Sequence, residues 1–254
     1  MKQNLILWIA AAVITFLAGF AHSLMNEYYP VSGSFGIDGK EIGYKLDKAY
    51  YGNDDYKFIV TTEIDSLHGI VKWKRIGAGD WNSLPLINSS GVIKGRIPLQ
   101  KPLTRIEYLI KLNYNDKVYS VLPDNRPVEL TFFGKVPGSV NFYYMFTLLG
   151  GLMLAFRTGL EYFRFPGKLK TLEIFTFIFF IVNVFAFHPL KLSYELGMVG
   201  KGAIPISAMF PFSSVLLFLI WTAATALIFN TKNYKIWPIP AAILTLIVYE
   251  LGNF

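Results

Sequence analysis

The sequence contains no cysteine. This absence excludes disulfides, iron–sulfur clusters and thiolate metal sites together. Charged residues are also scarce, at 16% of the chain, whereas soluble domains carry about 25%. Because apolar residues make up 53% of the 254 positions, much of the protein surface must face something other than water.

Common catalytic motifs are missing as well. The sequence has no glycine-rich phosphate loop, no His-Glu-x-x-His and no Gly-x-Ser-x-Gly. Ser213 and Ser214 could serve an intramembrane hydrolase, but no histidine or aspartate accompanies them at that depth. Their hydroxyls are better explained as bonding back to helix carbonyls. We therefore predict no catalytic residue and favour a protein that is not an enzyme.

Long uncharged runs are the dominant feature that is present, and they predict a membrane protein with five α-helical spans. The first run is long for a signal peptide, which favours an uncleaved anchor, although Gly19-Phe20-Ala21 resembles a cleavage site. The later runs predict a transmembrane helical bundle. The expected spans are Leu5–Leu24, Val140–Phe156, Leu172–Phe187, Met209–Phe229 and Ile236–Leu251.

Positive charge at the ends of these runs predicts their orientation. The net charge is +7, yet the polar segment between the first two spans is nearly balanced, so nucleic acid is not an expected partner. Segment 157–170 holds four Lys and Arg and segment 230–235 holds Lys232 and Lys235, whereas segment 188–207 holds only Lys191 and Lys201, partly offset by Glu195. The positive-inside rule then places the N-terminus inside a bacterial cytoplasmic membrane, and residues 27–137 and the C-terminus outside. Membrane lipid is an expected partner.

No expected span has a charge near its centre, which argues against a transporter or pump, since these normally carry one at mid-depth. Arg157, Glu173 and Glu250 lie near span ends, where we expect their side chains to reach water.

The segment between the first two spans predicts a β-sandwich, with domain limits of 1–26, 27–137 and 138–254. Apolar residues alternate with polar ones in Tyr56–Ile64 and Ile106–Tyr114, as in half-buried strands. Asn115-Asp116 predicts a hairpin turn into a following strand. The further expected strands are Gly69–Ile76, Gly91–Ile97, Val118–Leu122 and Val128–Phe133. Six or seven short strands in about 100 residues are typical of a sandwich.

Several stretches of this segment resemble a fibronectin-III or early-set immunoglobulin-like domain. They are Ile70-Val-Lys-Trp-Lys-Arg75, Trp81, Gly91-Val-Ile-Lys-Gly-Arg-Ile-Pro98 and Ile106-Glu-Tyr-Leu-Ile-Lys111. The junction Phe132-Phe-Gly-Lys-Val-Pro137 is similar to a family of bacterial multi-pass membrane proteins with this layout. The resemblance covers about residues 30–160 and implies an extracytoplasmic binding or spacing module, with nothing catalytic.

Two tryptophans and two histidines are candidate ligand contacts. Trp73 and Trp81 could stack on a carbohydrate, although packing in the core and at a sheet edge is the favoured interpretation. His22 and His188 are both expected at the outer membrane face, where they could ligate haem b or share a divalent metal with Glu195. The alternative is that the imidazoles only occupy a half-wet interface.

Small residues recur at four-residue spacing on two spans, which favours close helix packing. They are Gly151, Ala155 and Gly159 on one helix and Ala11, Thr15 and Gly19 on the other. Their partner helices could belong to this chain or to another subunit. The apolar loop 188–207 could be re-entrant or could pack on the sandwich.

These observations favour a non-enzymatic membrane protein that serves as an accessory, scaffold or assembly subunit of a larger membrane complex. The alternative function is a haem- or metal-binding redox protein that uses His22 and His188. A sensor is a third hypothesis, but its inner loops are too short to contain an output domain, so a partner subunit would have to carry the signal.

Overall fold

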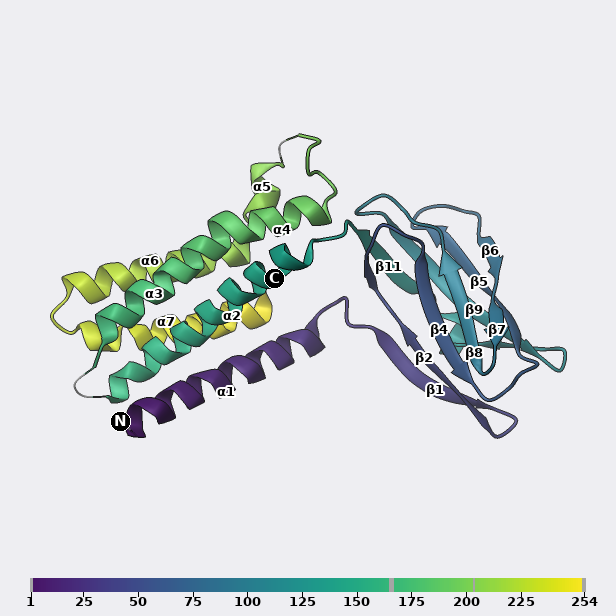
Figure 1. Ribbon diagram of the computed structural model, residues 1–254, viewed down its shortest axis with the longest axis horizontal. Helices are drawn as coiled ribbons and strands as arrows, with labels where there is room; N and C mark the ends of the chain where they lie inside the picture. The colour runs from purple at the N-terminus through teal and green to yellow at the C-terminus, as the bar shows by residue number, and fades with distance from the viewer. Residues whose placement is uncertain (1, 165–166, 203, 253–254) are drawn as a thin grey trace. The chain divides into compact units, whose positions relative to one another are not determined.

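The computed structural model describes residues 2–164, 167–202 and 204–252 and divides into two compact units. We call residues 1–26, 136–194 and 198–254 the helical unit, and residues 27–135 and 195–197 the β-unit. Figure 1 labels the helices and most of the strands.

Within the described residues, five helices are long and apolar enough to cross a membrane, which confirms the five expected apolar helices. The third of them comprises α3 and α4, and the short helix α5 lies between the third and the fourth. The helix bounds are α1 (Lys2–Met25), α2 (Gly138–Leu160), α3 (Leu169–Val182), α4 (His188–Glu195), α5 (Ile206–Met209), α6 (Phe212–Asn230) and α7 (Pro238–Leu251).

The third apolar helix is longer than the sequence indicated. After α3 the chain forms a π-helical turn at Asn183–Phe187 and continues directly into α4, so the helix extends from Leu169 to Glu195. The expected loop is therefore wrong over residues 188–195. Pro189 cannot donate a backbone hydrogen bond and its ring crowds the preceding turn. The wider π-turn before it gives the ring room, so the helix continues past the proline.

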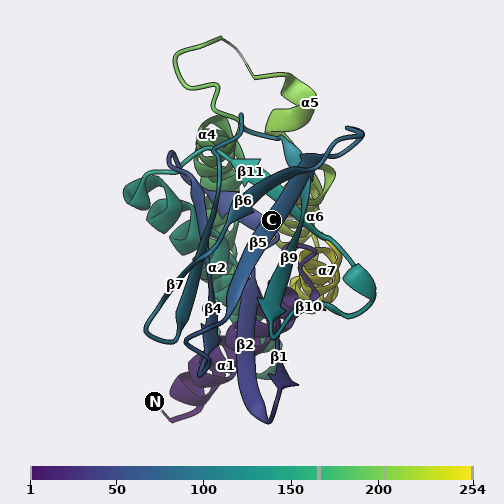
Figure 2. The same ribbon diagram turned by 90° about the vertical axis from the view of Figure 1, so that its right-hand side faces the viewer.

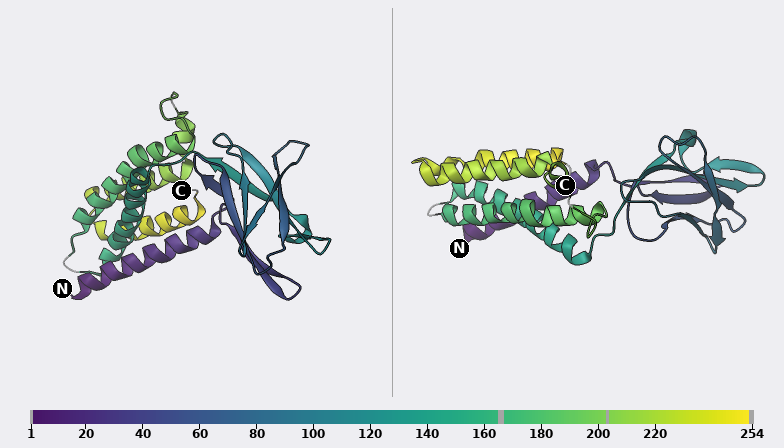
Figure 3. Two further views of the ribbon diagram at one scale, coloured as in Figure 1. Left: turned by 45° about the vertical axis from the view of Figure 1, so that its right-hand side comes forward. Right: turned by 90° about the horizontal axis from the view of Figure 1, so that it is seen from above.

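The long helices run alongside one another, as Figure 3 shows from two sides. Helix α2 contacts α1, α3 and α7, while α6 contacts α3 and α7. Their shared core is apolar and includes Leu152, Phe180 and Trp221, each essentially inaccessible to solvent.

The ends of these helices gather in two sets. In one set, the Gln3 side chain donates to the Phe163 carbonyl at 2.9 Å, and the Lys170 ammonium lies 5.5 Å from the Tyr234 ring centroid. In the other, the ring centroids of His22 and Tyr249 are 4.6 Å apart. Neighbouring helices in sequence therefore run in opposite directions along the unit.

The β-unit contains two sheets within the described residues (Figure 2). One has the order β1-β2-β4-β8-β7, and the other has the order β3-β11-β9-β5-β6 with β10 paired to β9. The pairings are antiparallel except for β3 with β11. The strand bounds are β1 (Val31–Ile37), β2 (Lys40–Leu46), β3 (Ala49–Tyr51), β4 (Tyr56–Thr62), β5 (His68–Arg75), β6 (Asn82–Pro85), β7 (Ile87–Ser89), β8 (Val92–Ile97), β9 (Arg105–Tyr114), β10 (Lys117–Ser120) and β11 (Val128–Phe133).

Apolar alternation explains how the two sheets share one core. Every second residue of β4 is buried, from Tyr56 to Thr62, and β9 alternates in the same way from Ile106 to Leu112. The buried side chains of both sheets form a single hydrophobic cluster. The predicted turn between β9 and β10 is confirmed: Asn115 and Asp116 both have positive φ, as a two-residue hairpin requires.

Candidate functional site

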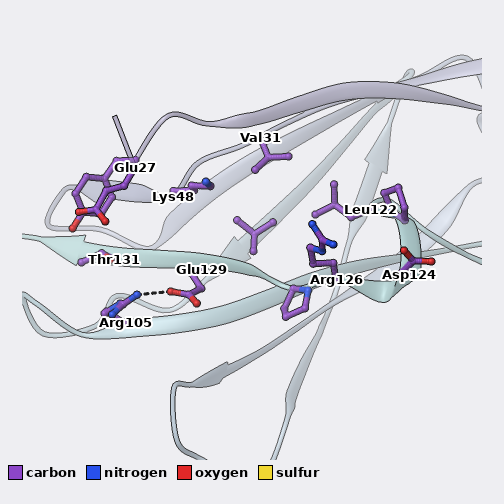
Figure 4. A pocket seen from close by; sticks show the side chains of 13 residues that line it. Glu27, Val31, Lys48, Arg105, Leu122, Asp124, Arg126, Glu129 and Thr131 are labelled. Carbon is purple, nitrogen blue, oxygen red and sulfur yellow. Dashed lines mark hydrogen bonds and ion pairs between the residues drawn. The ribbon is translucent and has the colours of Figure 1, made fainter. Parts of the chain in front are cut away.

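The β-unit carries an open cleft with a volume of about 600 Å³. Figure 4 shows it between β1 on one side and β9 and β11 on the other, with the loop before β11 along its rim. The lining residues are Glu27, Tyr28, Val31, Lys48, Arg105, Leu122, Pro123, Asp124, Arg126, Pro127, Val128, Glu129 and Thr131.

The cleft is lined by both signs of charge. Arg105 and Glu129 form an ion pair on neighbouring strands, and both side chains are more than half exposed. Lys48, Asp124 and Arg126 form no ion pair with any residue in the described ranges. With Glu27 included, the cleft is lined by three cationic and three anionic side chains. Such a lining is complementary to a polar partner that carries both positive and negative groups.

A strained turn sets the position of the cleft rim. Asp124 and Asn125 adopt φ values of 58° and 52°, in the left-handed region that costs most residues free energy. Asp and Asn tolerate this region better than other non-glycine residues. The Arg126 amide donates to the Pro123 carbonyl at 3.1 Å and closes the turn. This site was not predicted from the sequence, although Pro123-Asp-Asn-Arg-Pro127 is a strong turn signal.

Tyr28 adds a neutral aromatic ring to the lining. Burial, together with the adjacent Glu27 carboxylate, raises the pKa of its hydroxyl. The ring of Phe133 lies edge-on to it at 5.5 Å. Tyr28 is therefore un-ionised at neutral pH and offers a hydroxyl beside the charged groups.

The two tryptophans lie apart from this cleft. Trp73 of β5 is partly buried and packs against the core of the β-unit. Trp81 precedes β6, and the Lys74 ammonium lies 5.0 Å from its ring centroid. Trp73 therefore packs against the core of the β-unit, and the Trp81 ring has the Lys74 ammonium as a neighbour.

The two candidate histidines contact different tyrosines. His22 lies against Tyr249, whereas His188 is 7% exposed and lies 5.7 Å from the Tyr144 ring. Glu195 is buried in the β-unit, where its backbone carbonyl accepts a hydrogen bond from Gly134 at 2.8 Å. Among the described residues, no group of three or more His, Asp or Glu side chains could hold a metal ion.

A buried charged network joins α1 to the end of α2. Arg157 and Glu161 form an ion pair in which both side chains are 1% exposed. The Asn4 side-chain oxygen accepts hydrogen bonds from Arg157 at 2.8 Å and Arg164 at 3.1 Å. The Arg157 guanidinium also lies 5.5 Å from the Trp8 ring centroid. The expectation that Arg157 reaches water is wrong, because these partners compensate its charge inside the protein.

Glu173 is also buried, against the same expectation. Its side chain is on α3 and is inaccessible to solvent, and one carboxyl oxygen accepts a hydrogen bond from Thr225 of α6 at 2.8 Å. The other oxygen is buried without a hydrogen-bond partner among the described residues. Periodicity did not indicate this burial, because the contact partner lies 52 residues away.

No protein-family model and no curated protein matches this chain. A solved structure described as "Crystal structure of Br derivative BhCBM56" is similar over 39% of this chain and 97% of its own length, at 9% identity and a TM-score of 0.28. This likeness is too small to assign a fold family or a ligand.

The small residues predicted to pack helices do so within this chain. A side chain at Gly159 would meet Ala242 and the Pro238 carbonyl of α7, and one at Gly151 would meet the Phe180 ring of α3. Ala155, at the same four-residue spacing, is fully buried. On α1, Ala11 and Thr15 are buried and Gly19 faces the Tyr249 hydroxyl.

Proposed function

We propose that this chain is a non-enzymatic integral membrane protein of a bacterial cytoplasmic membrane that displays a binding domain at the outer face. It would act as an accessory, scaffold or assembly subunit of a larger membrane complex. The mixed-charge cleft of the β-unit is the observation that carries this proposal.

The helical unit supports the membrane placement. Its long helices are apolar, and their ends gather in two sets, as alternating crossings of a bilayer require. The set that contains Gln3 and Phe163 is the set richer in Lys and Arg, with Lys2, Arg157, Arg164, Lys168, Lys170, Lys232 and Lys235. The positive-inside rule makes that end cytoplasmic, which puts the β-unit outside.

Two facing sheets over one core support a sandwich of the immunoglobulin or fibronectin-III type. Such sandwiches present a rigid surface on which loops and strand edges bind partners. Here the cleft is bordered by β1, which lies at the edge of its sheet, and by the strained turn before β11.

The cleft chemistry favours another protein as the partner. A volume of about 600 Å³ is within the usual size range of ligand sites. Its lining, however, includes six charged side chains, whereas the sites that enclose small molecules have mostly apolar walls with few charged groups. A polar protein loop with charges of both signs would complement Lys48, Arg126 and Asp124.

Charge reversal in the cleft tests the proposal. The Lys48→Glu and Arg126→Glu double variant, expressed at the native level, should lose most of the subunits that co-purify with the wild-type chain in mild detergent. The physical reason is that like charges facing each other across an interface cost several kcal/mol. Native mass spectrometry of the extracted complexes measures the loss.

The matched control reverses two lysines on β4 and β8, with the Lys57→Glu and Lys94→Glu double variant. These side chains are exposed and lie outside the cleft lining. The control should keep its partners. A wild-type protein that leaves the membrane only as a lone monomer, or two double variants that behave alike, would overturn the proposal.

A further inference from the structure

A second cavity lies at the end of the helical unit where α3 and α7 begin. Its volume is about 480 Å³, and four of its lining side chains are cationic. The lining residues are Glu161, Arg164, Gly167, Lys168, Leu169, Lys170, Thr171, Tyr234 and Lys235.

The one acidic side chain of this lining is already engaged. Glu161 is paired with Arg157, and its Oε1 accepts the Lys168 backbone N–H at 2.7 Å. Arg164 also lies within 3.4 Å of that oxygen. The carboxylate therefore shapes the cavity wall, and the cations around it remain in excess.

Aromatic rings hold one of these cations at the cavity edge. The Lys170 ammonium lies 5.1 Å from the Phe229 ring centroid and 5.5 Å from that of Tyr234. Cation–π contacts of this kind position an ammonium without neutralising it. The Thr171 and Tyr234 side chains add hydroxyl groups to the lining.

We propose that this cavity binds the phosphate headgroup of an anionic phospholipid. A phosphate accepts several charge-assisted hydrogen bonds at once, which suits a cluster of Lys and Arg. Basic cavities between helix ends on the cytoplasmic side of a membrane bind such headgroups. The inference rests on the proposed membrane placement, with this end of the helices cytoplasmic.

The position of the cavity favours a lipid over free phosphate. Leu169, Lys170 and Thr171 form the first residues of α3, and Lys235 precedes α7 by three residues. The apolar parts of α3 and α7 begin at these residues, so the cavity lies at the depth of the lipid headgroups. A lipid bound there can keep its acyl chains against the helices. Trp237 lies beside the same helix start, at a position typical of the interfacial aromatic belt.

Lipid titration of the full chain tests the inference. Purified protein in a neutral detergent is titrated with phosphatidylglycerol and, separately, with phosphatidylcholine, and bound lipid is counted by native mass spectrometry. We expect phosphatidylglycerol to bind more tightly. We also expect the Lys168→Gln and Lys235→Gln double variant to weaken that binding about tenfold, because two charge-assisted contacts are lost.

The matched control removes two exposed lysines from the same end of the helices but outside the cavity, with the Lys2→Gln and Lys232→Gln double variant. It loses the same charge, and we expect its phosphatidylglycerol affinity to stay within about twofold of the wild-type value, because salt screens exposed charges outside the cavity. The single Lys168→Gln variant, whose side chain is exposed, should weaken binding in the same direction without a folding penalty.

Three results would overturn the inference: equal loss in both double variants, equal binding of the two lipids, or displacement of the lipid by inorganic phosphate at matched concentration. The last would assign the cavity to soluble phosphate. A chain that does not enter lipid nanodiscs at all would instead contradict the proposed membrane function, so the two failures are distinguishable.

Discussion

Arg157 and Glu161 lie one helical turn apart, and each is removed from water with its partner. Such a pair contributes little net stability compared with apolar residues, but loss of one member leaves a buried charge without compensation. Here two arginines, Arg157 and Arg164, converge on Glu161 and Asn4. The network therefore makes the attachment of α1 to α2 sensitive to single substitutions.

The Glu161→Gln variant should destabilise the helical unit by about 3 kcal/mol or more, the usual cost of breaking a buried pair. The expected result is a lower apparent melting temperature of the purified full chain, followed by helical circular dichroism in detergent. Asn4 should also become more accessible to hydrogen exchange near the start of α1.

Glu129→Gln is the matched control, because it breaks the exposed pair with Arg105, whose side chains are 61% and 52% exposed. Exposed pairs contribute about 0–1 kcal/mol. If Glu161→Gln shifted the melting temperature no more than Glu129→Gln does, the buried network would not stabilise the packing of α1 against α2.

Sequence patterns could not predict this network. Arg157 lies near the end of an expected span, and an arginine there ordinarily extends to the interface. Asn4, which accepts a hydrogen bond from Arg157, is 153 residues away, and a single sequence does not encode that proximity. The same holds for Glu173 with Thr225, and for the cleft residues Lys48 and Arg126.

Elements with a strong periodic pattern were predicted well. The bounds of β11 match the expected Val128–Phe133, and β4 and β9 show the expected alternation. The hairpin of β1 and β2 was missed, although Asp38-Gly39 between them is a strong two-residue turn signal. The glycines and serines of β1 carry little apolar pattern, which explains the omission.

Helix α2 and helix α7 approach closely at Gly159. A Cβ atom there would lie 2.7 Å from the Ala242 Cβ and 3.3 Å from the Pro238 carbonyl. The Gly159→Ala variant should therefore lower stability by about 1–3 kcal/mol, since overpacking outweighs the better helix propensity of alanine. Thermal unfolding of the full chain in detergent measures this.

Removing the opposing methyl group supplies the control. The Gly159→Ala and Ala242→Gly double variant should recover much of the loss, because the clashing atom is gone. Gly138→Ala, at a site with open space around it, should change stability by about 0.5 kcal/mol or less. An unchanged melting temperature for Gly159→Ala alone would contradict the close approach of the helices.

At the scale of the whole molecule, the five apolar helices and the β-rich segment between α1 and α2 were predictable from hydropathy and alternation. The continuation of α3 through Pro189 into α4 was not, because a proline normally ends a helix and a π-turn leaves no simple sequence signature. Which side of a membrane each helix end occupies remains a prediction from the Lys and Arg distribution.

The absence of cysteine makes that prediction directly testable, since any introduced thiol is unique in the chain. Two single variants, Ser66→Cys and Lys232→Cys, place the thiol. Ser66 lies in an exposed turn of the β-unit, and Lys232 lies in the exposed turn between α6 and α7. A membrane-impermeant maleimide should label the thiol at residue 66 in intact spheroplasts, and the thiol at residue 232 only after the membrane is opened. The reason is that alternate crossing separates the two turns by the bilayer, with the lysine-rich turn inside. Labelling at residue 232 in intact spheroplasts, with none at residue 66, would mean the opposite orientation and would move the mixed-charge cleft into the cytoplasm.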